Sequence, residues 1–317
     1  MTYQSTVIQD DLNSLPQLPA WVTSRRAETL ETVAFRSGAA LTVLDQMIGD
    51  PRDGVPVKLL ANRLALSAAT SISKLEGRLA READIRDAYH LTPPGEARGP
   101  DGDLLTFWRD AVGLRASGMG DINDLVGNDF AGEVGVWIDA GLERARTHGP
   151  LAGCVAVLCA VLDAQDRAER IACLLSDIVL ARALNWKMAQ PVTAQRLTKG
   201  MLRDLTTEGQ GAELAVQVRI LDSIKETIRL ARDLARRAEA LRSVAPKLRA
   251  KGSDAAVNLF LTEDAVAPAS MLSPLIWGTS IPMTSRAARR FCDRLVELGV
   301  ARELTGRPTF RLYGIVP

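Results

Sequence analysis

The sequence predicts a mainly α-helical protein in which a large helical body precedes a smaller C-terminal unit of three helices and a two-stranded hairpin. Two observations predict this class. Apolar residues recur at three- and four-residue spacings through most of the 317-residue chain, which is the period of an amphipathic helix. Over the last 65 residues this pattern gives way to two short strand-like runs around a Gly-containing turn.

Three segments are predicted along the chain. Residues 1–26 are expected to form an extended arm, because Pro16 and Pro19 favour polyproline geometry. Residues 27–250 are expected to form the helical body. Its apolar periodicity predicts helices over about 30–48, 57–76, 84–89, 103–112, 133–146, 151–164, 166–185, 193–206 and 210–244.

Two stretches of the body lack this periodicity. Residues 91–103 are dense in Pro and Gly and predict a surface loop, which is either a partner-binding loop or a structural connection. The glycine-rich stretch 117–130 predicts no definite element.

The remaining residues, 253–317, predict a winged helix-turn-helix. Helical patterns at 254–262 and 270–277 precede a third helix that Thr284 or Ser285 would N-cap and Gly299 would end. Strands are expected over 300–304 and 309–313, with a turn between them.

Composition excludes several classes of protein. Two histidines and four cysteines without a C-x-x-C pair leave few ligands for zinc or haem, so no metal or other cofactor is predicted. The longest apolar run, Leu151–Leu162, is shorter than the ~20 residues that cross a bilayer, so no membrane association is expected. The N-terminus lacks the pattern of a signal peptide, and the expected location is therefore the cytoplasm.

The near-neutral net charge of +1 conceals an asymmetry between the two parts of the chain. Residues 1–218 carry 22 basic and 28 acidic side chains, whereas residues 219–317 carry 17 and 10. Many of the basic side chains in residues 219–317 lie on the helix predicted at 210–244. Basic side chains that alternate with Asp and Glu along a helix are typical of a solvated face. From residue 282 onward the chain holds seven arginines and three acids.

These terminal arginines predict contact with DNA. Three of them fall in the N-terminal half of the third helix, the half that enters the major groove in helix-turn-helix proteins. A fourth lies at the tip of the wing, within reach of phosphates or the minor groove. The alternative is that this unit packs on the body as a rigid protein-interaction module. The predicted contact residues are Ser285, Arg286, Arg289, Arg290 and Arg307.

Long stretches of the chain resemble a known family. The segments LPAWVTSRRAETLETVAFRSGAAL, RLALSAATSISKLEGRLAREADIRDAYHLTPPGEARGPDGDLLTFWR and CLLSDIVLARALNW resemble the bacterial domain-of-unknown-function family 1403. The resemblance covers nearly the whole chain and implies a family without implying an activity.

A second resemblance is to Fic-type proteins, which transfer AMP or related groups to hydroxyl side chains. Lys74-Leu75-Glu76-Gly77 resembles their N-terminal Ile-Glu-Gly-like motif, and LDAQDRAER followed by IACLL aligns with H-P-F-x-(D/E)-G-N-G-R and the helix after it. Under this resemblance Glu76, Leu162, Asp166 and Arg170 mark a degenerate site.

The degenerate motif departs from the Fic pattern at the positions of the general base and of the phosphate-binding glycines. Leu162 replaces the histidine that would act as general base, and Arg167-Ala168-Glu169 replaces the Gly-Asn-Gly that would cradle a pyrophosphate. The resemblance therefore implies a helical fold without AMP transfer, and the protein is expected not to be an enzyme.

Three functional hypotheses remain open. The first is a DNA-binding or regulatory protein acting through the winged helix. The second is a scaffold, descended from a Fic-like fold, that binds a protein partner or associates with itself. The third is a residual nucleotide-binding transferase, which needs a nucleotide near Asp166–Arg170. Separately, His90 adjoins the loop at 91–103 and could share a pocket with Glu76 or Asp84.

Overall fold

The computed structural model describes residues 15–24, 29–49, 54–93, 95–207, 210–248, 251–307 and 309–315. These residues are mainly helical, and the sheet among them is a single antiparallel pair of two-residue strands. The helices of the body are α1 Ala20–Thr23, α2 Leu30–Gly49, α3 Val57–Leu75, α4 Glu82–Leu91, α5 Gly99–Gly113, α6 Met119–Val126, α7 Val134–His148, α8 Pro150–Ala164, α9 Glu169–Ala183, the 3₁₀ turn η3 Ala194–Arg196, α10 Lys199–Thr207, α11 Gln210–Val244 and the 3₁₀ turn η4 Ala245–Lys247.

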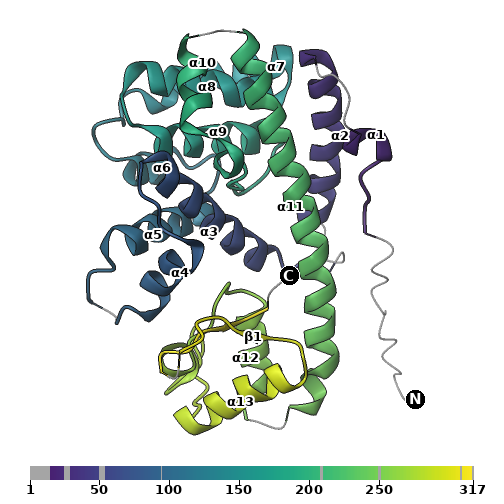
Figure 1. Cartoon of the computed structure of the whole chain (residues 1–317), viewed down its shortest axis with the longest axis vertical. Coiled ribbons are helices and arrows are strands. Elements are labelled where there is room, and N and C mark those ends of the chain that lie inside the picture. Colours follow the sequence, from purple (N-terminus) through teal and green to yellow (C-terminus); the bar gives the residue numbers. More distant parts are fainter. Residues whose placement is uncertain are drawn as a thin grey trace.

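The long helix α11 connects the two parts of the molecule. Figure 1 shows it running from α10, beside α2, down to the C-terminal unit. Its buried side includes Ile220, Ile224, Ile228 and Leu234, and it packs against α2 over much of their common length. The N-terminal segment joins this face, because Leu15 is buried and Arg232 donates to the carbonyls of Leu15 and Pro16.

Helices α7, α8 and α9 form the most closely packed part of the body. Gly149, at a φ of 93°, makes the turn that joins α7 to α8. Gly141 and Gly153 face each other across this hairpin. A Cβ atom added to Gly153 would lie 2.6 Å from the Gly141 carbonyl oxygen, so the close approach requires glycine.

The body differs from the predicted boundaries at four places. The helix expected from 166 begins at Glu169, because Arg167 adopts a φ of 61° that breaks the helix. The helix expected over 193–206 divides into η3 and α10. The stretch at 117–130 contains α6, and the loop expected to end at 103 is shorter, since α5 begins at Gly99 with Pro100 in its first turn.

The C-terminal unit consists of α12 Ser253–Phe260, the π-helical turn η5 Pro268–Leu272, α13 Ser285–Glu297, β1 Arg302–Glu303 and β2 Tyr313–Gly314. Strand β1 pairs with β2 in the register Arg302↔Gly314, and Val266 forms a bridge to the other side of β2. The strands are shorter than predicted. The prediction of a helix over 270–277 is also wrong beyond Leu272, where η5 ends, since Pro274 has no amide N–H to continue the helix.

Helix α13 forms as its sequence predicts. The Thr284 hydroxyl accepts a hydrogen bond from the Ala287 amide at 3.3 Å and caps the first turn. Ala288, Phe291, Cys292 and Leu295 are buried along one face. Gly299, at a φ of 71°, follows the helix and lets the chain turn into β1.

None of the described helices is both long enough and apolar enough to cross a bilayer. The predicted extended arm, 1–26, lies partly outside the described residues. Within it, residues 16–19 carry no regular structure and α1 follows.

Candidate nucleic-acid interface

Helix α13 presents a cationic surface at its N-terminal half. Arg286, Arg289 and Arg290 are all exposed, because the opposite face of the helix supplies its core contacts. Within the described part of the chain, none of the three forms an ion pair. Ser285, the remaining predicted residue of this turn, is exposed and its hydroxyl lies 3.0 Å from that of Ser273.

The acidic residues of α13 lie toward its C-terminal half and have partners. Glu297 accepts from Arg294 at 2.9 Å, and Asp293 accepts from the Tyr313 hydroxyl at 3.3 Å. The uncompensated positive charge of the helix is therefore concentrated in its first two turns, and favours an anionic partner there.

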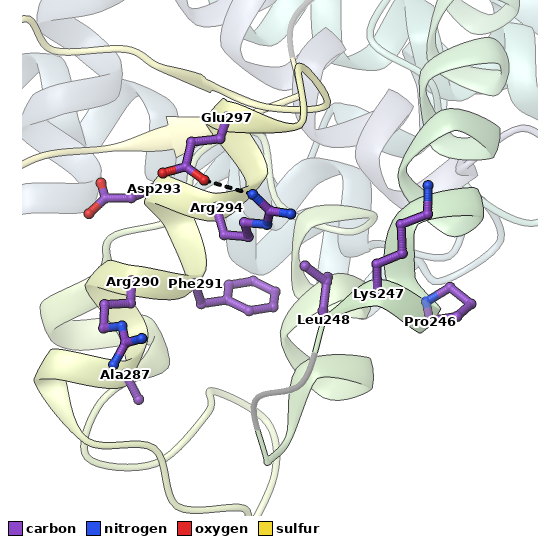
Figure 2. A pocket seen from close by; sticks show the side chains of 9 residues that line it. All are labelled: Pro246, Lys247, Leu248, Ala287, Arg290, Phe291, Asp293, Arg294 and Glu297. Carbon is purple, nitrogen blue, oxygen red and sulfur yellow. Dashed lines mark hydrogen bonds and ion pairs between the residues drawn. The ribbon is translucent and has the colours of Figure 1, made fainter.

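A groove of about 1090 Å³ lies between α13 and the end of the long helix. Figure 2 shows Arg290 beside Ala287 on one side and Lys247 on the other, with the Phe291 ring facing Leu248 between them. Lys247 and Arg290 add positive charge to the rim, whereas Arg294 is engaged by Glu297. Lys247 was not among the predicted contact residues, since it belongs to η4, about forty residues before α13 in the chain.

Arg307 differs from the three arginines of α13. Its Nη2 atom lies 3.6 Å from Asp87 Oδ2 on α4, although just over half of the side chain (57%) remains exposed. Asp87 also accepts from Arg86 at 2.7 Å, and Arg86 in turn donates to the Leu304 carbonyl at 3.1 Å. The turn between the strands is thus attached to the body through an acidic side chain.

The residues of the predicted degenerate site are brought together only in part. Arg170 donates from Nε at 3.0 Å and from Nη2 at 2.6 Å to Glu76 Oε1, so the two residues form an ion pair although 94 positions separate them. Leu162 is half-buried near the end of α8, and Asp166 is exposed in the following turn. Among the described residues, neither has a hydrogen bond or ion pair with Glu76 or Arg170.

The first turn of α9 adds an acid to this neighbourhood. Glu169 is buried, and its Oε2 atom has no hydrogen-bond partner among the described residues. Under the Fic resemblance, Glu169 stands where the last glycine of Gly-Asn-Gly would be.

His90 has a different partner from those that the sequence suggested. Its Nε2 atom lies 3.1 Å from Asp264 Oδ1, and not beside Glu76 or Asp84. Arg109 donates to the same Asp264 oxygen and also to Glu263 Oε2 at 2.9 Å. Burial alone would raise the pKa of Asp264, but Arg109, His90 and Arg63 hold it well below its ordinary value. Asp264 is therefore a buried carboxylate ion.

Further hydrogen bonds join the same surfaces. Asn62 donates to the Thr262 carbonyl at 2.7 Å, and Arg63 to the Ile315 carbonyl at 2.6 Å. These bonds run from α3 to the segment after α12 and to the residue after β2, and with the Asp264 cluster they fix the C-terminal unit relative to the body. Residue types alone gave no signal for this interface, because its partners lie about 150 to 250 positions apart in the chain.

The comparisons with known proteins identify a family. No curated protein matches the chain. The model of a family described as protein of unknown function (DUF1403) matches residues 6–315, which is nearly the whole chain. The protein therefore belongs to the DUF1403 family.

Proposed function

We propose that this protein binds duplex DNA through its C-terminal unit. The observation that carries the proposal is the exposed triad Arg286, Arg289 and Arg290, which has no ion-pair partners among the described residues. Arginine pairs in bidentate fashion with phosphate and with the guanine edge, so an unneutralised set of three on one helix suits a nucleic acid.

The order of elements supports assigning this unit to the winged helix-turn-helix class. Two helical segments, α12 and η5, precede α13, and the antiparallel pair β1–β2 follows it. The bridge from Val266 to Tyr313 places a third extended segment beside β2. In such units the helix before the hairpin inserts its N-terminal residues into the major groove. Figure 1 shows α13 at the end of the molecule, away from α8 and α10.

The groove beside α13 is a suitable path for one phosphate strand. With Arg286, Arg289 and Arg290 facing the duplex, Lys247 on the other side of the groove would lie where a phosphate backbone passes. Phosphate contacts position a protein on its duplex without selecting sequence. Arg307, which is paired with Asp87, is assigned a secondary DNA contact at the turn between the strands.

A cytoplasmic location is part of this proposal.

The test is a titration of a labelled duplex followed by fluorescence anisotropy. The variant R286A/R289A/R290A is compared with R146A/R203A/R236A, which removes three exposed arginines from α7, α10 and α11. Removing three direct contacts is expected to weaken binding by roughly 100-fold or more, whereas the control should lose only a few-fold. Equal losses in both variants would contradict a contact made by α13.

A second candidate is a protein-interaction scaffold whose body derives from a Fic-like fold. The ion pair of Arg170 with Glu76 favours it, because it joins the motif-like segment at residues 74–77 to the degenerate core segment. This candidate predicts no duplex binding even at low salt, so the same titration separates it from the first.

A further inference from the structure

A second groove lies on the other side of α13, where the C-terminal unit meets the body. Its volume is about 610 Å³, within the range of small-molecule sites. The end of α4 and the residues just after it form one wall, and η5, α13 and residues 309–313 form the others. Figure 1 shows α4 above the C-terminal unit, so these walls come from both parts of the molecule.

The inner end of the groove is preorganised. His90 lines it, and its Nε2 atom lies 3.1 Å from the buried Asp264, to which Arg109 also donates. Tyr313 also lines it and donates to Asp293 at 3.3 Å. Because these side chains already have partners, a ligand would meet a fixed surface and would order little on binding.

Most of the lining is apolar. Leu91, the last residue of α4, and Pro93 just after it line this space together with Ala267 and Pro268. Phe310 contributes an aromatic ring that is 72% exposed, and its backbone has a φ of 55°. A bulky residue in the left-handed region is uncommon, and strained residues of this kind cluster at functional sites, ligand clamps among them.

The charge of the groove selects the ligand further. Arg289 and Arg311 line it with a single acid, Asp293, to which the Tyr313 hydroxyl donates, so the basic side chains outnumber the acidic one. Two guanidinium groups beside an apolar wall fit a molecule with a hydrophobic body and one anionic end.

We propose that this groove binds a small apolar carboxylic acid. Its hydrophobic body lies between Phe310 and Pro268, and its carboxylate faces Arg289 and Arg311. The inference goes beyond DNA binding and does not depend on it, because the site is complete without nucleic acid.

The test uses 2-naphthoate as the probe, titrated into the full-length protein by isothermal calorimetry without DNA. A ligand of this size is expected to saturate one site with a Kd of about 1 mM or tighter. The exposed Ala269 on η5 lines the groove, so Ala269→Trp should fill it and abolish binding. R289Q/R311Q should weaken binding about tenfold, and the neutral analogue 2-naphthamide should bind the wild type more weakly by a similar factor.

Two controls keep the result specific. Arg302→Gln removes an exposed arginine of the same unit that does not line the groove, and should leave the Kd unchanged. R286A/R290A impairs the proposed DNA contact but should not affect naphthoate, so failure of one proposal is distinguishable from failure of the other. Absence of saturation up to about 10 mM, ten times the expected Kd, or unchanged binding in Ala269→Trp, would overturn the inference.

Discussion

Asp177 shows how a single buried carboxyl group links this protein's stability to pH. It lies on α9 with 1% of its surface exposed, and its Oδ1 atom accepts from the amides of Val192 and Thr193 at 3.1 and 3.0 Å. Burial raises the pKa of Asp177 to about 8, although these hydrogen bonds act in the opposite direction. The protonated form is therefore the one that the fold accommodates.

This raised pKa predicts a loss of stability as pH rises. In the unfolded chain the group ionises near pH 4, whereas in the folded protein it stays protonated up to about pH 8. Between these values the contribution of Asp177 to the free energy of unfolding should fall by roughly 1.4 kcal/mol per pH unit. Asp177→Asn keeps the Oδ1 acceptor and cannot ionise, so it should remove this slope.

Urea unfolding of wild type and Asp177→Asn at pH 5 and pH 8 measures the effect. The variant should gain stability relative to wild type as pH rises. Any change in the free energy of unfolding that the amide causes independently of pH is the same at pH 5 and at pH 8, and it cancels in this comparison. A difference between the two proteins that is the same at both pH values would refute the assignment.

At the scale of elements, the hairpin of α7 and α8 depends on the absence of side chains at its crossing. A Cβ atom on Gly153 would lie 2.7 Å from the Ala145 Cβ, in addition to its contact with the Gly141 carbonyl. Both groups belong to the facing helix, so the hairpin would have to open to accept a methyl group.

Gly153→Ala is accordingly expected to destabilise the protein by about 1–3 kcal/mol, despite the higher helix propensity of alanine. Gly38 provides the matched control. It is exposed within α2, and nothing lies within 4 Å of its added Cβ. Gly38→Ala should stabilise by roughly 0.5–1 kcal/mol. Thermal unfolding of both variants decides the matter, and two changes of the same sign would be incompatible with this packing.

Sequence patterns predicted individual helices well where local signals suffice. Helix α13 begins after Thr284 and ends before Gly299 because capping and apolar spacing are local. The start of α9 was missed, since it depends on the left-handed Arg167, a residue type without that preference. The π-helical turn at 268–272 was missed for a similar reason, because its i→i+5 pattern has no sequence period of its own.

At the scale of the whole molecule, the buried charges around Asp264 hold the two parts together. Asp264 is fully buried, and Arg109 is 9% exposed between it and Glu263. Removing one member of such a cluster leaves the others buried and uncompensated. None of these contacts could be predicted from residue spacing. In contrast, the placement of the three α13 arginines on one face of the helix could be predicted, because it depends only on the period of that helix.

Asp264→Asn should therefore destabilise the protein by about 3–5 kcal/mol. Asp233→Asn is the control, because it breaks an exposed pair with Arg236 on α11 and should cost under about 1 kcal/mol. Chemical unfolding measures both, and limited proteolysis should show earlier cleavage between the body and the C-terminal unit in Asp264→Asn. Similar stabilities of the two variants would show that the cluster does not join these parts.

The same cluster is compatible with the proposed function, because it holds the C-terminal unit on the body while the arginines of α13 remain exposed. Arg289 lies at the boundary between the proposed DNA contact and the groove proposed for a small acid. A bound carboxylate at Arg289 would therefore compete with a phosphate or base for the same guanidinium group.

The central claim, that α13 contacts DNA, is tested most directly by the salt dependence of duplex affinity. Affinity is measured between about 50 and 200 mM salt for wild type, R286A/R289A/R290A and R146A/R203A/R236A. The slope of log affinity against log salt should be shallower for the α13 variant by about one unit for each arginine that contacts a phosphate, and unchanged for the control. Identical slopes for wild type and the α13 variant, or no binding at the lowest salt, would contradict it.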